Sequence, residues 1–259
     1  MHLNKHKMLE IVRHQLAIDM NCNDQDFIED GIVFCEASMN ENRRLFERQS
    51  PYLEIATMGK GVVISADANV LKKVKPLLEN KSREDIFVVP FIYGYSLYYI
   101  PDSGTVKQLP YPNGLTIHVK EGKEIHELYN IEGFENAIQY DPNHMRPDIL
   151  VIYVKNGDKI IGMAGASVDS NTMWQIGIDV LEDYRNKGIA KSLVSNLAIM
   201  IMERGIVPYY GMESSNIPSQ AVANSSGFVP AWMCTYKNIF DGKSPYHNKV
   251  GSVLKGRSL

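Results

Sequence analysis

Apolar residues recur at intervals of three and four along the segment from Ile189 to Arg204. This spacing places them on one face of a helix, so the segment is predicted to be an amphipathic helix that packs against a core. Gly205 follows directly, and a glycine just past the last periodic residue is a typical helix stop. The same spacing predicts further helices over Met8–Ile18, Ala66–Asn80, Glu124–Tyr140 and Ser219–Gly227.

Runs of apolar, β-branched and aromatic residues around this helix predict strands. The runs ILVIYV (149–154) and KIIGMAGASV (159–168) are separated by Asn156-Gly157, and Asn-Gly is the strongest short hairpin signal. The run MWQIGIDV (173–180) precedes the long helix. Other strands are predicted at residues 85–100, 115–119, 206–212 and 228–239.

The segment from Pro101 to Gly114 interrupts these patterns, because it holds three of the twelve prolines and two glycines. We therefore predict a domain boundary there, with a smaller N-terminal α/β domain over residues 1–112 and a second domain over 113–259. Hairpins that feed a strand–helix–strand–helix unit predict an α+β fold with a mixed, mostly antiparallel sheet and flanking helices. From Asp241 onward the chain is polar and is predicted to be a tail.

Composition places the chain among ordinary globular proteins, with 44% hydrophobic and 22% charged residues. A net charge of −3 argues against a nucleic-acid partner. No run reaches transmembrane length and the N-terminus lacks a secretory apolar region, so we expect a cytoplasmic protein without a membrane partner. No metal site is predicted, because the cysteines share no metal-ligand spacing and are interpreted as reduced, buried thiols; they are Cys22, Cys35 and Cys234.

Two cations and a glycine, Arg185, Lys187 and Gly188, stand at the start of the long helix. A helix N-terminus exposes unpaired backbone N–H groups and the positive end of the helix dipole, so an anion such as phosphate is its natural ligand. An ordinary strand-to-helix turn with solvated cations is the alternative. The sequence has no GxxxxGK[ST] motif and no GxGxxG after a strand, which excludes the common nucleotide-binding loops.

The order of these residues resembles a known signature. Residues 185–190, RNKGIA, follow a strand and a Tyr184-Arg185 step, and they are similar to the acyl-CoA motif [RQ]-x-x-G-x-[GA] of the GCN5-related N-acetyltransferase (GNAT) superfamily. Asn216, Ser219 and Gly227-Phe228 are similar to the second motif of that family, N-x-x-[AS]-x(7)-G-F. The resemblance spans residues 115–239 and is particularly marked for a bacterial subgroup with an extra N-terminal domain.

The resemblance implies a GNAT-type sheet and acetyl-CoA (coenzyme A) as the cofactor. It implies that the strand before the motif separates from its neighbour and that backbone groups of Ile178 and Val180 bind the pantetheine arm. Arg185 and Lys187 would flank the pyrophosphate, while Asn216 and Ser219 would lie near the pantetheine or thioester end. The backbone amides that would hold the pyrophosphate belong to Asn186, Lys187, Gly188, Ile189, Ala190 and Lys191.

The acid–base residues are harder to assign. The family often has a tyrosine four residues before the glycine of its second motif, and this chain has Ala223 there. Some relatives have a glutamate that acts as the catalytic base on the strand, and this chain has Trp174 at that position. Glu213, at the end of a predicted strand, is our first candidate for the catalytic base, and a solvated carboxylate is the alternative interpretation. Other residues are weaker candidates for the acid–base or acceptor site, and for each of them a packing or hydrogen-bonding role is the alternative interpretation. They are Asp179, Tyr209, Tyr210, Tyr236 and His144.

The function expected from the resemblance is acetyl-CoA-dependent N-acetyltransfer to the amine of an unidentified small-molecule or peptide acceptor by direct attack. Ala223 favours a second hypothesis, a non-catalytic acyl-CoA-binding or sensor protein. A tandem arrangement, in which the N-terminal domain is a degenerate second copy, is a structural alternative. The oligomeric state stays open, with a homodimer among the expectations.

Overall fold

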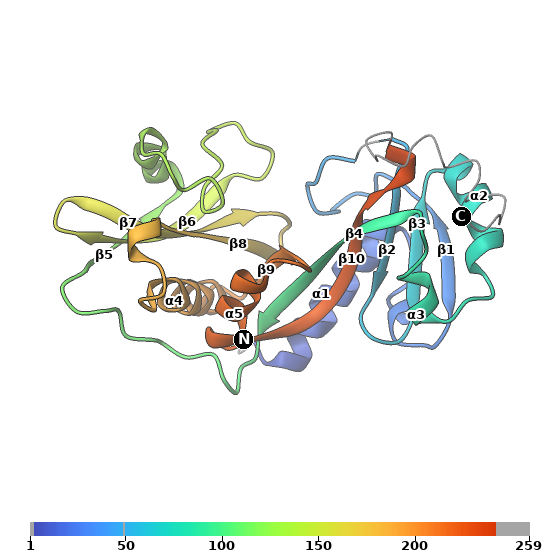
Figure 1. The fold of residues 1–259 in the computed structure, drawn as a ribbon, viewed down its shortest axis with the longest axis horizontal. Helices are drawn as coiled ribbons and strands as arrows, with labels where there is room; N and C mark the ends of the chain where they lie inside the picture. The colour runs from blue at the N-terminus through green and yellow to red at the C-terminus, as the bar shows by residue number, and fades with distance from the viewer. Residues whose placement is uncertain (1–2, 49, 242–259) are drawn as a thin grey trace. The chain divides into compact units, whose positions relative to one another are not determined.

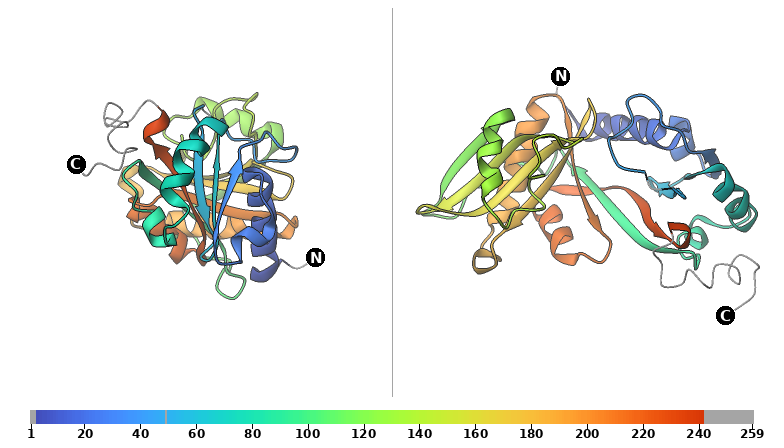
Figure 2. Two further views of the ribbon diagram at one scale, coloured as in Figure 1. Left: turned by 90° about the vertical axis from the view of Figure 1, so that its right-hand side faces the viewer. Right: turned by 90° about the horizontal axis from the view of Figure 1, so that it is seen from above.

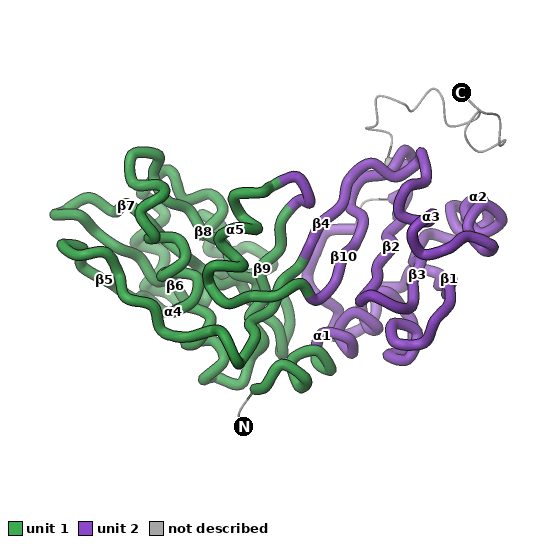
Figure 3. The backbone as a smooth tube through the Cα atoms, turned by 60° about the horizontal axis from the view of Figure 1, so that its bottom comes forward, with its two compact units in different colours: residues 1–11, 98–212, 216–230 green, residues 12–97, 213–215, 231–259 purple. Residues whose placement is uncertain are grey.

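The computed structural model describes residues 3–48 and 50–241, so most of the predicted tail lies outside the described residues. The chain divides into two compact units (Figure 3). Unit 1 comprises residues 1–11, 98–212 and 216–230, and unit 2 comprises residues 12–97, 213–215 and 231–259. The functional domain boundary after residue 112 stays a prediction. No helix of the described residues is long and apolar enough to cross a membrane.

Unit 1 holds a mixed sheet whose strand order is β9-β8-β7-β6-β5 (Figure 1). Neighbouring strands from β5 to β8 are antiparallel, whereas β8 and β9 are parallel. The strands are β5 (Thr116–Glu121), β6 (Asp148–Asn156), β7 (Lys159–Val168), β8 (Met173–Val180) and β9 (Val207–Glu213). The helices are η2 (Gly122–Asn130), η3 (Glu182–Tyr184), α4 (Ile189–Glu203) and α5 (Ile217–Ser225).

Local sequence signals explain the centre of this unit. Asn156 pairs with Lys159 across the β6–β7 turn, and Gly157 takes the left-handed φ of 60° that the turn needs. The hairpin prediction is therefore confirmed. The long helix is confirmed as α4, bounded by Gly188 and Gly205 at φ values of 81° and 77°. Its apolar stripe is buried, as predicted.

The two faces of this sheet are covered differently (Figure 2). A Cβ on Gly162 of β7 would lie 2.8 Å from Ile189 Cγ2, so α4 packs closely on that face. On the other face, a Cβ on Gly177 of β8 would overlap the carbonyl oxygen of Asn136. The helix predicted up to Tyr140 is wrong beyond Asn130, because the later backbone amides bind a strand carboxylate instead of continuing a helix.

The segment between β4 and β5 is bound to α4 rather than hanging free. Ser192 Oγ donates to the carbonyl of Pro110 at 2.8 Å, and Ser195 Oγ donates to the carbonyl of Lys107 at 2.6 Å. Asn196 completes the attachment through both of its amide atoms, which bond the backbone N–H and C=O of Leu109 at 2.9 Å each. We call residues 107–110 the strap.

Unit 2 contains strands in the order β1-β3-β2-β10-β4, with β1 and β3 parallel and β2 antiparallel to both β3 and β10. Val70, Val74 and Leu78 of α2 pack into its apolar core. The strands are β1 (Ile32–Glu36), β2 (Leu53–Thr57), β3 (Val62–Ala66), β4 (Ile92–Pro101) and β10 (Phe228–Asn238). The helices are α1 (Lys5–Met20), η1 (Asp24–Phe27), α2 (Ala68–Leu78), α3 (Arg83–Ile86) and η4 (Ile239–Asp241). Of these, α1, β4 and β10 contribute residues to both units.

Two corrections concern this part of the chain. The strand predicted from Asp85 begins only at Ile92, because Ser82 Oγ accepts the N–H of Asp85 at 3.1 Å and starts the short helix α3. The strands β1, β2 and β3 were not predicted. The helices predicted around Met8–Ile18 and Ala66–Asn80 are confirmed, and so is the α+β class with a mixed, mostly antiparallel sheet.

Candidate active site

The strands β8 and β9 pair over only part of their length. Their parallel register runs from Met173↔Val207 to Gln175↔Tyr209. Beyond it, β8 continues to Val180 and keeps its β7 partners, but no β9 partner is present for these residues in the described structure. The predicted separation of this strand from its neighbour is confirmed. Backbone groups along such an edge need another hydrogen-bonding partner. Ile178 and Val180 both lie on it, and the carbonyl of Val180 already accepts from Arg185 Nε.

The turn after β8 has an unusual backbone. Asn186 and Gly188 both adopt left-handed conformations, at φ values of 61° and 81°. Asparagine and glycine are the residues that tolerate this region best. The first turn of α4 begins directly after Gly188, so the N–H groups of Ile189, Ala190 and Lys191 lack acceptors within the helix and carry the positive end of its dipole. The predicted amide donors therefore form one continuous turn.

The two cations of the motif fold back onto this turn. Arg185 Nε donates to the carbonyl of Val180 at 3.0 Å, and Lys187 Nζ donates to the carbonyl of Asp183 at 2.9 Å. Lys187 also lies over the ring of Tyr184, 5.1 Å from its centroid. Because both cations bond backbone carbonyls, they fix the shape of the turn as well as supplying positive charge.

At the start of α5, Asn216 and Ser219 are joined by a helix cap. Asn216 Oδ1 accepts the backbone N–H of Ser219 at 3.1 Å. The hydroxyl of Ser219 is hydrogen-bonded to that of Tyr210, which lies in β9 and is only 5% exposed. Burial raises the pKa of Tyr210, the negative charge of Asp179 acts in the same direction, and the bond with Ser219 opposes both. The roles of Asn216 and Ser219 toward a thioester stay predictions.

Ala223 follows Ser219 by four residues on α5 and is completely buried. Residues four apart lie on the same face of a helix. Ala223, which occupies the position of the family's usual tyrosine, therefore lies on the same face of α5 as Ser219. On that face Ser219 contacts Tyr210 of β9. Gly227, which ends this motif, is tightly packed too, since a Cβ there would lie 2.7 Å from the Cα of Val106.

Asp179 projects from β8 to the segment that covers the sheet. Its carboxylate accepts the backbone N–H and the side-chain amide of Asn136 at 2.7 Å each, and the N–H of Ala137 at 3.0 Å. Burial raises the pKa of Asp179, although these hydrogen bonds act in the opposite direction. The interpretation of Asp179 as a residue that bonds neighbouring backbone is confirmed.

A buried polar network fixes the point where β8 and β9 separate. Tyr209 donates to Asp169, which is fully buried and also accepts from Ser167 Oγ at 3.0 Å. Arg146 Nη1 approaches Asp169 Oδ1 at 3.5 Å and donates to Gln175 Oε1 at 3.1 Å. Sequence reasoning missed Asp169 and Arg146, because nothing in the local pattern links a strand end to a distant loop. Tyr209 was a candidate proton donor, and the structure assigns its hydroxyl to this network.

The remaining candidates lie in different surroundings. Glu213 belongs to unit 2, where its carboxylate lies 3.9 Å from Lys237 Nζ and its side chain is 55% exposed. Burial and the hydrogen bond to Glu213 raise the pKa of Tyr236 to about 12. His144 Nδ1 lies 3.1 Å from the carbonyl of Arg146, within its own loop. Trp174 is half-buried in β8.

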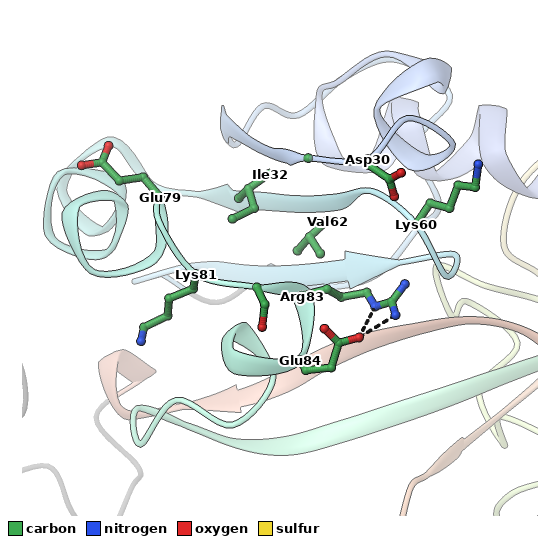
Figure 4. Close-up of a pocket in the computed structure, with 10 residues that line it drawn as sticks. Asp30, Ile32, Lys60, Val62, Glu79, Lys81, Arg83 and Glu84 are labelled. Atoms are coloured by element: carbon green, nitrogen blue, oxygen red, sulfur yellow. Dashed lines mark hydrogen bonds and ion pairs between the residues drawn. The ribbon is translucent and has the colours of Figure 1, made fainter.

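Unit 2 also contains an open cavity of about 470 Å³ between β1, β3 and the start of α3 (Figure 4). Its charges are mixed, and Arg83 is paired with Glu84 at 2.6 Å. A lining with charges of both signs favours neither an anionic nor a cationic ligand. No predicted site residue lines the cavity, whose charged residues are Asp30, Lys60, Glu79, Lys81, Arg83 and Glu84. The described residues also contain no group of three side chains suited to a metal ion.

Residues 117–228 match the model of the acetyltransferase (GNAT) family. The chain carries a GNAT acetyltransferase domain. The match covers the segment in which the two motifs predicted a GNAT domain. The matched segment includes β8, the turn at Asn186 and Gly188, α4 and α5. The GNAT family is one of acyltransferases that use acyl-CoA donors, and the separated edge of β8 lies inside the matched domain.

Solved structures resemble the chain at low identity, and 69 chains match. A GCN5-related N-acetyltransferase-like protein from Streptococcus suis is 14% identical with a TM-score of 0.43, over 69% of this chain and 72% of that protein. A GNAT-family acetyltransferase from Colwellia psychrerythraea is 15% identical with a TM-score of 0.45, over 71% and 64%. A GCN5-related N-acetyltransferase from Kribbella flavida is 14% identical with a TM-score of 0.41, over 55% and 56%.

The chain thus spans between about half and three quarters of the length of these three proteins. No curated protein matches the chain. The likeness to the GNAT family rests on the match of residues 117–228.

Proposed function

We propose that this protein is an acetyl-CoA-dependent N-acetyltransferase that moves an acetyl group to an amine by direct attack. The observation that carries the proposal is the continuity of three features within the GNAT domain. These are the β8 edge beyond Gln175, the left-handed turn at Asn186 and Gly188, and the N-terminus of α4. Together they offer an extended hydrogen-bonding edge that leads into an anion site.

The residues fit an acyl-CoA donor. Backbone groups of Ile178 and Val180 would hold the pantetheine arm, and the amides from Asn186 to Lys191 would hold the pyrophosphate. Gly188 suits this role because a Cβ there would lie 3.2 Å from Lys191 Cε, on a backbone that disfavours side chains. When bound, the donor supplies an activated thioester carbonyl. Acetyl as the acyl group is part of the proposal.

Proton transfer needs a donor and an acceptor among the chain's own residues. We assign the donor role to Tyr210, whose phenol reaches the α5 face that carries Ser219 and Ala223. Its raised pKa keeps the proton on Oη at neutral pH, which is the state that a proton donor requires. Glu213 stays our proposed base for the acceptor amine.

A non-catalytic acyl-CoA-binding or sensor role is the second candidate. Ala223 favours it, because this position provides no proton donor of its own. The two functions share the donor site and differ only in turnover.

Calorimetry with acetyl-CoA, followed by a free-thiol assay over a panel of amines, tests both functions. Micromolar binding together with thiol release that depends on an amine supports the transferase. Binding without release for any amine in the panel supports the sensor. Absence of binding contradicts both, and Gly205→Ala provides a control for general destabilisation, since Gly205 lies at the opposite end of α4.

A further inference from the structure

Two cysteines that are distant in sequence are brought together in unit 2. Cys22 follows the C-terminus of α1, and its N–H donates to the carbonyl of Ala17 at 3.0 Å. Cys35 lies in β1. Their neighbours are bonded directly, since Asn21 Nδ2 donates to the carbonyl of Glu36 at 2.9 Å. The end of the helix and the end of the strand are therefore held against each other.

Further contacts fix this junction. Asn21 has a left-handed φ of 59°, and its Oδ1 accepts from Asn40 Nδ2 at 3.0 Å. The same Asn40 nitrogen donates to the carbonyl of Ile18 in α1 at 2.9 Å. Because Asn40 and Asn21 bridge the helix end to the segment after β1, the spacing between the two cysteines is set by the backbone around them.

The alternation of side chains along β1 determines the face of the sheet to which Cys35 projects. Phe34 packs on the core of unit 2 and under Lys75 of α2, 5.7 Å from its ring centroid. Successive side chains of a strand point to opposite faces, so Cys35 projects to the face away from α2. There its thiol lies near the thiol of Cys22, close enough for each to shift the pKa of the other.

The two thiols are only half-buried, in contrast to Cys234, which is 4% exposed. The interpretation of the cysteines as buried apolar residues is therefore wrong for Cys22 and Cys35 and holds for Cys234. A small oxidant can reach a half-buried thiol pair.

The surroundings make the two thiols unequal. The contact with the Cys35 thiol, burial and the nearby charges of Asp26 and Asp24 all raise the pKa of Cys22. The same contact lowers the pKa of Cys35, against the effects of burial and of Asp26. The thiolate, which is the reactive form of cysteine, therefore develops on Cys35.

We propose that Cys22 and Cys35 form a redox-active dithiol that a hydroperoxide converts into an intramolecular disulfide. The Cys35 thiolate attacks a peroxide oxygen, an S–O bond forms, the O–O bond breaks, and the leaving hydroxide takes up a proton to become water. The Cys22 sulfur then attacks the Cys35 sulfur, the S–S bond forms, and the oxygen leaves as a second water with the Cys22 proton. Two thiols are oxidised by two electrons, and one hydrogen peroxide is reduced to two waters.

This inference does not depend on the proposed acyltransferase activity, and its test needs no acyl-CoA. The full chain is treated with graded hydrogen peroxide, and free thiols are titrated after denaturation. We expect the thiol count to fall from three to one, with a peptide pair joining Cys22 to Cys35 in the mass spectrum and full recovery after dithiothreitol. Cys35 should react at least about tenfold faster than buried Cys234.

Matched variants separate the roles. Cys234→Ser should still lose two thiols and give the same linked peptides, whereas Cys35→Ser should form no internal disulfide. Cys22→Ser should accumulate a sulfenic acid on Cys35 that dimedone traps. Wild-type protein that keeps Cys22 and Cys35 reduced at a peroxide concentration that oxidises Cys234 would overturn the proposal. So would linked peptides that contain Cys234, or a Cys35→Ser variant as reactive as wild type. Circular dichroism of each variant confirms that the chain is folded.

Discussion

Gln175 and Tyr209 are the last residues of β8 and β9 that pair with each other, and their side chains also meet, with Tyr209 Oη 3.4 Å from Gln175 Oε1. The same two side chains connect to Asp169 and Arg146. The point at which the strands separate is thus fixed by a buried polar network. The opening on which the proposed function depends is a built feature of the domain.

This network should matter strongly for stability. Asp169→Ala removes a buried carboxylate and leaves the groups around it without their acceptor, so we expect a loss of about 3–5 kcal/mol in the free energy of unfolding. Urea denaturation provides the measurement. Glu121→Ala is the control, because it breaks the exposed 2.6 Å pair with Arg204 and should cost no more than about 1 kcal/mol. Equal losses for the two variants would contradict the role given to Asp169.

The turn before α4 should control donor affinity. Gly188→Ala forces a side chain onto a left-handed backbone and against Lys191, so the amides of the turn must shift, and we expect the Kd for acetyl-CoA to rise at least about tenfold. Gly205→Ala imposes a similar backbone strain at the other end of α4, with nothing within 4 Å of its Cβ. It should lower stability and leave the Kd within about twofold of wild type. Isothermal titration calorimetry distinguishes the two.

Tyr210 should affect turnover without affecting donor binding. Tyr210→Phe keeps the ring and removes the proton, so we expect kcat to fall about 10²-fold with an unchanged Kd for acetyl-CoA. Because burial raises the pKa of Tyr210 above its ordinary value, the wild-type rate should show no loss from this group at neutral or mildly alkaline pH. Tyr209→Phe, whose hydroxyl belongs to the buried network, should lower stability rather than kcat. A normal kcat in Tyr210→Phe would exclude the donor role.

The proposed role of Glu213 as the catalytic base is tested by a variant that keeps the size of the side chain and removes its charge. Glu213→Gln removes the carboxylate that would accept the amine proton, so we expect kcat/KM for the acceptor to fall about 10²-fold, with the rate partly recovered at higher pH as the free amine becomes abundant. Glu203→Gln, at the exposed end of α4, is the matched control and should behave as wild type. If Glu213→Gln retains full activity at neutral pH, the base lies elsewhere.

Local patterns were sufficient to predict the elements to which we assign the donor site. The stripe of α4, the glycines at its two ends and the Asn156-Gly157 turn act through neighbouring residues, so the sequence predicts them well. The separation of β8 from β9 was predicted only from the resemblance, because no residue pattern in β8 indicates where its pairing stops.

Long-range contacts account for what was missed. The segment after Asn130 abandons its helical pattern because Asp179, more than forty residues later, accepts its amides. The strands β1, β2 and β3 are five residues each and too short for a clear alternation. The contact of Cys22 with Cys35 depends on how the end of α1 meets β1, which spacing alone does not encode.

The strap has a practical consequence for anyone who dissects this chain. A fragment that begins at residue 113 matches the family domain, but it discards the backbone that satisfies Ser192, Ser195 and Asn196 on α4. Those polar side chains would then face water along the helix to which we assign the donor site. A fragment of the GNAT domain should therefore start upstream of Lys107, with the proline-rich stretch retained as part of the helix's own surface.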